Sequence, residues 1–268
     1  MNIAVFGANG RMGNALLDAL SQQTSLVLSA AIVRPTCAWL NRPVSQFVSS
    51  FRGDLVYSEY SKPALERASV AIDFTLPASF ERHLELCVIT RTPVVIGTTG
   101  LTKEQLLLLE TAAKSIPIVF AANYSVGVTL MLKLCRLAAS RLADSADIEI
   151  IEAHHRHKVD APSGTAMAIG EAIADEVGRS LETDAIYGRE GDMGERDRRT
   201  IGFSTIRGGD IIGEHTALFA DIGERLEITH KASSRQTFAL GALRAAQWVV
   251  GKPVGLYDME DVLELRDM

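Results

Sequence analysis

The stretch EAHHRHKVDAPSGTA, residues 152–166, gathers side chains that can move protons and bind anions. It contains His154, His155, His157 and Lys158, although the chain of 268 residues has only six histidines. Imidazole and ammonium groups act as general acids and bases when their pKa values lie near the working pH. We therefore interpret this stretch as a candidate catalytic segment.

A turn and the start of a helix follow these side chains. The sequence Asp160–Pro162 predicts a turn. Ser163, Gly164 and Thr165 then open a helix that we expect to end near residue 177. The first N–H groups of a helix lack intrahelical partners and can bind a carboxylate or phosphate. A proton donor beside an anion pocket suits the reduction of a small acidic substrate.

Two other interpretations of the histidines stay open. Glu152 with the three histidines could form a zinc site, which usually takes four ligands. On a strand, however, alternate side chains face opposite sides, so His155 and His157 share a face only if the strand continues. The second alternative is a structural histidine cluster. We predict no metal site.

A glycine-rich segment near the N-terminus predicts a dinucleotide site. Gly7–Gly13 (GANGRMG) follows the strand-like Asn2–Phe6 and opens the helical pattern Arg11–Leu20. This is the context that the dinucleotide fingerprint requires, with the pyrophosphate on the helix N-terminus. The spacing G-x-x-G-x-x-G is a variant of the usual form, and a plain glycine turn is the alternative.

The end of the second predicted strand indicates which dinucleotide is used. An NAD enzyme often has Asp or Glu there to bind the ribose hydroxyls. This chain has Val33 followed by Arg34, and a guanidinium can pair with a 2′-phosphate. We expect NADPH to be preferred, with NADH as the second cofactor. The alternative is that Arg34 is only a solvated surface residue.

The strands and helices that must position these groups fall into two parts. Up to about residue 122, strand-like and helical segments alternate, which is typical of βαβ units and a parallel sheet. The turns Gly97–Gly100 and Ala121–Tyr124 follow strands and would lie at the ligand-binding edge of such a sheet. The predicted elements here are Leu26–Val33, Val70–Phe74, Pro93–Ile96, Ile116–Phe120 and the helix Lys103–Ser115.

The second part has a different pattern. A long helix over Val126–Leu142 precedes a strand over Asp147–His154. Three later β-patterned segments are separated by turn sequences and predict a meander. They are Thr200–Arg207, Ile211–Ala220 and Arg225–His230, and a last helix covers Gln236–Val250.

We therefore expect an α/β protein, with a Rossmann-like dinucleotide-binding domain plus an α+β substrate and oligomerisation domain with an open mixed sheet. The first domain would cover residues 1–122 and the second residues 123–235. A C-terminal helical segment, residues 236–268, would return to the first domain.

Composition narrows the functional class. The net charge of −6 argues against a nucleic-acid or anionic-membrane surface, and no apolar run is long enough to cross a membrane. Cys37, Cys87 and Cys135 are odd in number and widely spaced, which fits a reducing compartment. We expect a cytoplasmic protein whose partner is a small molecule.

Several motifs together resemble one enzyme family. EAHHRHKVDAPSGTA closely resembles the signature of the 4-hydroxy-tetrahydrodipicolinate reductase (dihydrodipicolinate reductase) family of lysine biosynthesis. Similar motifs occur in order along nearly the whole chain. They are GANGRMG, Asp73–Pro77 (DFTLP), VIGTTG, AANYSVGV and GEHTALFADIGERLEITHKASSR.

This resemblance implies a reaction and roles for individual residues. The family reduces a cyclic unsaturated dicarboxylate with NADH or NADPH. By correspondence, His154 is a proton donor or acceptor, Lys158 is the proton donor, and His155 contacts substrate. Ser163, Gly164 and Thr165 would hold a carboxylate. The cofactor would be held by Gly7, Ala8, Asn9, Gly10, Arg11, Met12, Arg34, Gly97, Thr98, Thr99, Ala121, Ala122, Asn123 and Tyr124. The family is a homotetramer built through the sheet of its second domain.

The chain departs from the family pattern at two positions. An acidic residue is frequent at the position of Val33 in members that use NADH well, and phenylalanine is common at the position of Tyr124. The other functional classes left open are a different NAD(P) reductase acting on another small acid, a non-catalytic cofactor-binding regulator, and a metal-dependent hydrolase.

Overall fold

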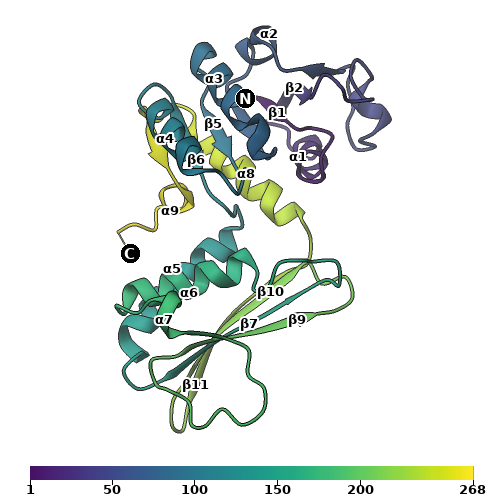
Figure 1. Ribbon diagram of the computed structural model, residues 1–268. Coiled ribbons are helices and arrows are strands. Elements are labelled where there is room, and N and C mark those ends of the chain that lie inside the picture. Colours follow the sequence, from purple (N-terminus) through teal and green to yellow (C-terminus); the bar gives the residue numbers. More distant parts are fainter. Residues whose placement is uncertain (268) are drawn as a thin grey trace. The chain divides into compact units, whose positions relative to one another are not determined.

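In a computed structural model, which describes residues 1–267, the chain folds into two compact units (Figure 1). The first unit comprises Met1–Val126 and the chain from Arg235 onward, and the second comprises Gly127–Ser234. The chain thus leaves the first unit once and later returns to it. The domain roles assigned from the sequence remain predictions at this point.

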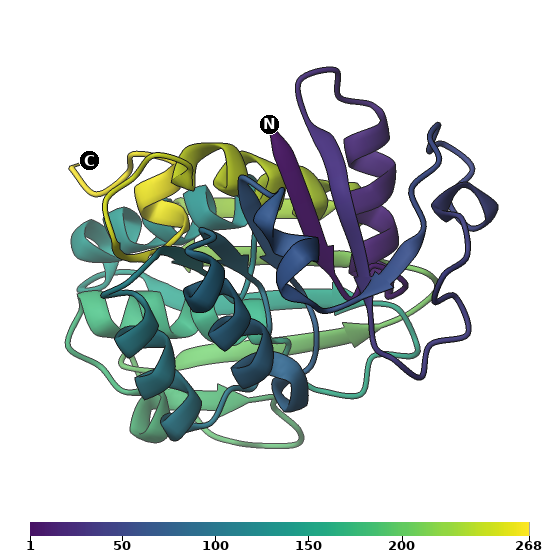
Figure 2. The ribbon, with the colours of Figure 1, turned by 90° about the horizontal axis from the view of Figure 1, so that it is seen from above.

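The first unit is built on a seven-stranded sheet in which every pair of neighbours is parallel. Its strand order is β12-β6-β5-β4-β1-β2-β3. Figure 2 shows β1 and β2 as dark purple arrows next to each other, with α1 beside them. The elements are β1 (Asn2–Phe6), α1 (Arg11–Ser21), β2 (Val27–Val33), the 3-10 helix η1 (Val44–Gln46), β3 (Tyr57–Glu59), α2 (Lys62–Glu66), β4 (Val70–Asp73), α3 (Pro77–Thr90), β5 (Val94–Ile96), α4 (Lys103–Ala112), β6 (Pro117–Phe120), α8 (Gln236–Val249), β12 (Gly255–Tyr257) and α9 (Met259–Val262).

Two buried clusters hold this sheet between its helices. Side chains of β1 alternate between them, with Ile3 and Val5 in one cluster and Ala4 and Phe6 in the other. Helix α8 packs against α1 and against β4, β5 and β6. A Cβ atom at Gly241 of α8 would lie 1.7 Å from the carbonyl oxygen of Tyr124, so only glycine allows this close approach.

The second unit contains a five-stranded sheet with the order β11-β10-β7-β9-β8. Strand β7 pairs antiparallel with β10 and parallel with β9, so the sheet is mixed. The elements are α5 (Val126–Leu142), β7 (Asp147–His154), α6 (Gly164–Glu176), α7 (Leu181–Asp184), β8 (Ala185–Tyr187), β9 (Ile201–Arg207), β10 (Gly213–Ala220) and β11 (Arg225–Ala232). The predicted α/β class and open mixed sheet are confirmed.

The predicted meander over residues 200–230 is wrong. Strands β10 and β11 form a hairpin, but β7 lies between β9 and β10. The reason is the long segment between β7 and β9, which contains α6 and lets β9 return parallel to β7, as a crossover connection does. Turn sequences between the segments predicted their ends to within two residues but carried no information about which strands pair.

One face of this second sheet is covered by helices, as Figure 1 shows for α5 and α6. Ile148 and Ile150 of β7 and Ala217 and Phe219 of β10 are buried in the cluster that also contains α5 and α6 side chains. The residues that alternate with them on β10 are half-buried rather than buried. The sheet therefore has one face packed in the core of the unit and one face whose side chains are partly exposed.

Candidate active site

The glycine loop between β1 and α1 has a shape that only glycine permits. Gly7 has φ +64°, and a Cβ atom there would lie 2.7 Å from Cγ2 of Thr75. A Cβ atom at Gly13 would lie 2.3 Å from the carbonyl oxygen of Gly7. Helix α1 begins after Gly10, which offers no side-chain cap to the first N–H groups. These features fit a backbone cradle for a pyrophosphate at a helix N-terminus.

The other predicted cofactor residues follow strands of the same sheet. Arg34 comes directly after β2 and is exposed, Gly97 after β5 and Ala121 after β6. Because all strands of this sheet run parallel, the carboxyl ends of β2, β5 and β6 lie at the same edge of the sheet. Ala8 N–H donates to the Ile32 carbonyl and Ala121 N–H to that of Ile96, which keeps each turn against its neighbour. The structure thus brings the predicted cofactor residues to one edge.

The hydroxyl groups of Thr98 and Tyr124 differ in their hydrogen bonding. The Thr98 side chain is buried, and its hydroxyl has no hydrogen-bond partner among residues 1–267, so it offers a polar atom to a ligand. Tyr124 is buried too, but its hydroxyl donates to the Ile96 carbonyl at 2.8 Å and lies 3.0 Å from that of Val119. Burial raises the pKa of this phenol. Tyr124 therefore anchors the turn 121–124 to the ends of β5 and β6.

Asp73 supports the glycine loop from the neighbouring strand. Its Oδ1 accepts hydrogen bonds from the Thr75 N–H at 2.8 Å and the Thr75 hydroxyl at 2.6 Å. Its Oδ2 lies 2.8 Å from Nδ1 of His83, which is stacked on Phe6. Asp73, the last residue of β4, thereby holds Thr75 against Gly7, which accounts for the DFT sequence at the end of this strand.

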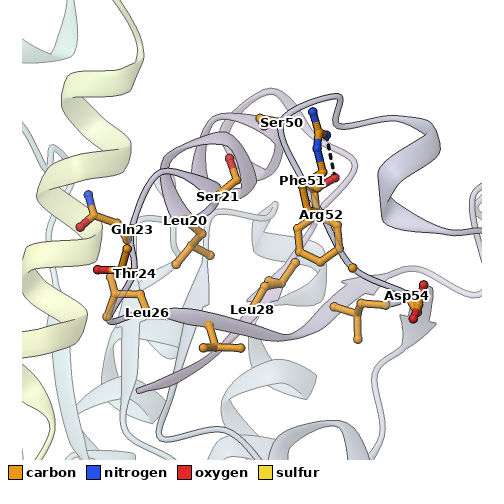
Figure 3. Close-up of a pocket in the computed structure, with 13 residues that line it drawn as sticks. Leu20, Ser21, Gln23, Thr24, Leu26, Leu28, Ser50, Phe51, Arg52 and Asp54 are labelled. Atoms are coloured by element: carbon orange, nitrogen blue, oxygen red, sulfur yellow. Dashed lines mark hydrogen bonds between the residues drawn. The ribbon is translucent and has the colours of Figure 1, made fainter.

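A separate pocket of the first unit lies away from these residues. Figure 3 shows its lining side chains, which come from the end of α1, the start of β2 and residues 50–55. Val27 and Leu28 of the pocket lie at the amino end of β2, whereas Arg34 follows its carboxyl end. Ligands of open parallel sheets bind at the carboxyl ends of strands, so we assign no role in the reaction to this pocket.

In the second unit, the end of β7 brings a buried carboxylate to a histidine. Glu152 and His154 are two residues apart on the strand and therefore share a face. Oε2 of Glu152 lies 2.6 Å from Nδ1 of His154, and only 1% of the Glu152 side chain is exposed. On the other side of the imidazole, a Cβ atom at Gly213 would lie 3.1 Å from Nε2. The absence of a side chain at Gly213 leaves space beside Nε2.

Arg207 of β9 clamps the same carboxylate. Its Nη1 and Nη2 atoms donate to Oε2 and Oε1 of Glu152, each at 2.8 Å. Burial raises the pKa of Glu152, but hydrogen bonds and charge from Arg207 and His154 outweigh it and hold this pKa below its ordinary value. Burial lowers the pKa of His154 against the opposing effect of Glu152, and Lys158 and Arg207 lower it further. An ionised glutamate thus faces a neutral histidine.

Ser163 links this pair to the start of α6. Its N–H donates to Oε1 of Glu152 at 3.1 Å, and its hydroxyl accepts from the Ala166 N–H as the N-cap of the helix. The hydroxyl also lies 2.9 Å from Nε2 of His215 in β10. Both the N–H and the hydroxyl of Ser163 therefore have hydrogen-bond partners within the protein. Gly164, in contrast, is exposed, and a Cβ atom there would meet nothing within 4 Å.

The remaining residues of the motif follow in a turn. The His155 and Arg156 N–H groups donate to the carbonyls of Ile211 and Gly209, which holds the turn against the β9–β10 connection. Lys158 Nζ lies 2.8 and 2.9 Å from the two Asp160 oxygens. Nδ1 of His155 is buried and has no partner among the described residues, whereas His157 is exposed. No group of three or more His, Cys, Asp or Glu in residues 1–267 has a metal-binding arrangement.

Each of the two units matches a known family model. Residues 1–124 match the family model of the dihydrodipicolinate reductase N-terminus, and residues 127–263 match that of its C-terminus. The chain belongs to the dihydrodipicolinate reductase family. Its members named 4-hydroxy-tetrahydrodipicolinate reductase include one from Pseudoalteromonas atlantica, 57% identical over 98% of both chains. Another, from Pseudomonas fluorescens SBW25, is 57% identical over 98% of this chain and 99% of the relative.

Solved structures give the same result for the fold. The dipicolinate-bound dihydrodipicolinate reductase from Paenisporosarcina sp. TG-14 is 25% identical, with a TM-score of 0.75 over 96% of this chain and 97% of that one. An amine dehydrogenase from Mycobacterium smegmatis, 11% identical with a TM-score of 0.61, covers 97% of this chain and 95% of its own. That second likeness shows the fold alone.

Two residues that contact the dihydrodipicolinate reductase motif were not nominated from the sequence. Arg207 and His215 lie on β9 and β10, more than 50 residues along the chain from the groups they contact. Spacing along one strand could have indicated Glu152 as a partner of His154, because residues two apart share a face. Nothing in the local sequence indicates Arg207, since its contact depends on the strand order.

Proposed function

We propose that this chain catalyses the NAD(P)H-dependent reduction of 4-hydroxy-tetrahydrodipicolinate to tetrahydrodipicolinate in lysine and diaminopimelate biosynthesis. The observation that carries this proposal is the 57% identity to a reductase of that name over 98% of both chains. The engaged Glu152–His154 pair and Lys158 supply the acid–base groups that such a reduction needs.

We assign proton transfer to His154 and Lys158 and substrate binding to His155, Ser163, Gly164 and Thr165. The buried Nδ1 of His155 and the exposed backbone at Gly164 support the binding role. A dicarboxylate held at the start of α6 would be kept close to Lys158, and a positioned acid speeds proton transfer by about 10²- to 10⁴-fold. Ser163 acts in this scheme by fixing the helix start.

The pyrophosphate would be held by the glycine loop, which comprises Gly7, Ala8, Asn9, Gly10, Arg11 and Met12. The rest of the dinucleotide would be held by the turns after β5 and β6, which comprise Gly97, Thr98, Thr99, Ala121, Ala122, Asn123 and Tyr124. The loop at Gly7 and Gly13, which side chains would fill, and the buried Thr98 hydroxyl fit this group. The bound cofactor supplies the hydride. We further propose that NADPH is preferred over NADH, because Arg34 follows β2 where a carboxylate would otherwise select NADH.

The assembly is a homotetramer in our proposal, formed through the uncovered face of the second sheet. On that face Ile206, with 51% of its surface exposed, and the half-buried Ile151 and Leu218 lie beside polar pairs such as Thr216–Thr229, a mixture typical of subunit interfaces. Sedimentation velocity is expected to give a tetramer, and a monomer would contradict this assignment.

We also propose a cytoplasmic location, which the free thiols of Cys37, Cys87 and Cys135 support. Within residues 1–267, no helix is long and apolar enough to span a bilayer.

A spectrophotometric assay tests the reaction itself. The substrate is generated enzymatically in the cuvette, and oxidation of NADPH is followed with and without the protein. We expect turnover that depends on both substrate and protein. Failure to oxidise NADPH with this substrate, by a protein that binds NADPH, would favour a reductase acting on another small acid.

A further inference from the structure

Both oxygens of the buried Glu152 carboxylate are engaged by groups from several elements of the second unit. Its Oε2 faces His154 Nδ1 and Arg207 Nη1, and its Oε1 faces Arg207 Nη2 and the Ser163 N–H. The Thr205 hydroxyl approaches Oε1 at 3.4 Å. A buried carboxylate is costly unless it is paired in this way, so these contacts define its position closely.

We propose that Glu152, locked by Arg207, is the positioning residue for His154: it holds the imidazole through Nδ1 and presents Nε2 for proton transfer. This inference rests on the proposed function, in which His154 exchanges a proton during the reduction. A carboxylate that fixes the tautomer and orientation of a histidine leaves the second ring nitrogen available for chemistry.

The hydrogen-bond geometry determines where the imidazole proton lies. Because the pKa of Glu152 is held below its ordinary value, the group is a carboxylate and only accepts hydrogen bonds. The 2.6 Å contact therefore requires a proton on Nδ1 of His154. In neutral His154 the lone pair is then on Nε2, the nitrogen beside Gly213. The same glutamate thus defines which atom of the ring accepts a proton.

A second contact extends this effect to the proposed carboxylate site. Oε1 accepts the N–H of Ser163, the N-cap residue of α6. The proton-transferring ring and the start of α6 are therefore fixed to two oxygens of a single carboxylate. A change at Glu152 is expected to disturb the distance between the acid–base group and the bound substrate, which alters kcat more than KM.

The charges around His154 define the sign of the expected pH effects. On β7 the group that faces it is Glu152, on β9 it is Arg207, and on β10 it is His215. Lys158 acts on it from the following turn, with Asp160 paired to Lys158, and His230 of β11 lies opposite His215. Of these, Glu152 raises the pKa of His154, whereas Lys158 and Arg207 lower it.

The test compares Glu152→Gln and Arg207→Gln with a matched control, Glu149→Gln. Glu149 lies on the same strand and is also held by two arginine contacts, from Arg189 and Arg196, but it faces no histidine. The pH profile of kcat/KM is measured for each variant, and the contribution of His154 is identified by its loss in His154→Gln.

We expect Glu152→Gln to lower kcat about 10- to 100-fold, taking as the scale the loss that follows removal of a partner that orients a metal-bound histidine. The pKa assigned to His154 should move down by about one unit in Glu152→Gln and up in Arg207→Gln. Glu149→Gln should leave that pKa unchanged even if it lowers stability. If Glu152→Gln does not fold, the upward movement in Arg207→Gln carries the test.

Two outcomes separate this inference from the proposed function. A wild-type protein that does not reduce the dicarboxylate would overturn the function and with it the role of His154. An active wild type whose Glu152→Gln variant folds and keeps its kcat and pH profile would overturn the positioning role alone. An unchanged profile in Arg207→Gln would do the same.

Discussion

Nε2 of His215 lies 2.9 Å from the Ser163 hydroxyl, which itself accepts a hydrogen bond from the Ala166 N–H. A serine hydroxyl has one proton and two lone pairs, so the Ser163 hydroxyl can still donate to Nε2 or accept from it, and the tautomer of His215 determines the direction. Burial lowers the pKa of His215 to about 4, and the positive charge that His154 carries when protonated lowers it further. The folded protein thus resists protonation of a residue that contacts the helix cap.

Acid should destabilise the protein through this histidine. The folded pKa of about 4 lies below the ordinary value of 6.5, so the unfolded chain binds more protons between these values and stability falls as pH decreases through them. We expect a loss of about 2 kcal/mol from pH 7 to pH 5. Urea unfolding at the two pH values measures it. In His215→Asn this part of the pH dependence should disappear, and its persistence would contradict the assignment.

Lys158→Ala should lower kcat by about 10²- to 10⁴-fold, because it removes the proposed proton donor. Arg156→Ala is the matched control, since Arg156 is an exposed cation two residues earlier in the same turn. Steady-state NADPH oxidation measures both variants. A Lys158→Ala enzyme with a kcat near that of wild type would exclude Lys158 as the donor, whereas Arg156→Ala should retain activity.

Arg34→Ala should change cofactor choice. A hydrogen bond to a charged group contributes about 1.5–3 kcal/mol, so kcat/KM for NADPH should fall about 10- to 100-fold. The value for NADH should remain close to that of wild type, because NADH lacks the 2′-phosphate. Arg67→Ala, an exposed arginine after α2, serves as the control. Equal losses with both cofactors would show that Arg34 does not discriminate between them.

Gly13→Ala and Gly10→Ala form a matched pair within one loop. A Cβ atom at Gly13 would lie 2.3 Å from the Gly7 carbonyl oxygen, whereas at Gly10 the distance to that oxygen would be 3.2 Å. We expect Gly13→Ala to cost about 1–3 kcal/mol of stability and to weaken NADPH binding. Gly10→Ala should cost less than about 1 kcal/mol. Urea unfolding and NADPH fluorescence titration measure the two effects, and equal losses would contradict the close-packing argument.

Local patterns predicted the elements of this protein well where long apolar segments alternate with helical ones. Asn2–Phe6, Val126–Leu142 and Asp147–His154 have the predicted bounds. The short strands β3, β8 and β12 were not predicted, because three residues are too few to establish a period and, unlike Val94–Ile96 of β5, they are not runs of β-branched residues.

The candidate site was predictable only in part, for a related reason. The motif residues from His154 to Thr165 are neighbours in sequence, and the turn and helix N-terminus that they form are local structures. Arg207 and His215 reach the site through strand pairing, and the meander expected for these segments would have paired β9 directly with β10, with no place for β7 between them. Contacts that depend on strand order are therefore the part that sequence patterns could not supply.

The return of the chain through α8 and β12 has a consequence for biosynthesis. On the ribosome, Gly127–Ser234 emerges as one continuous segment and has all the strands of its sheet before the chain is complete. The nucleotide-binding sheet, in contrast, lacks its edge strand β12 and the helix against Tyr124 until the segment Gln236–Tyr257 has been made. Premature termination would thus leave the internal unit able to fold and the N-terminal one unfinished.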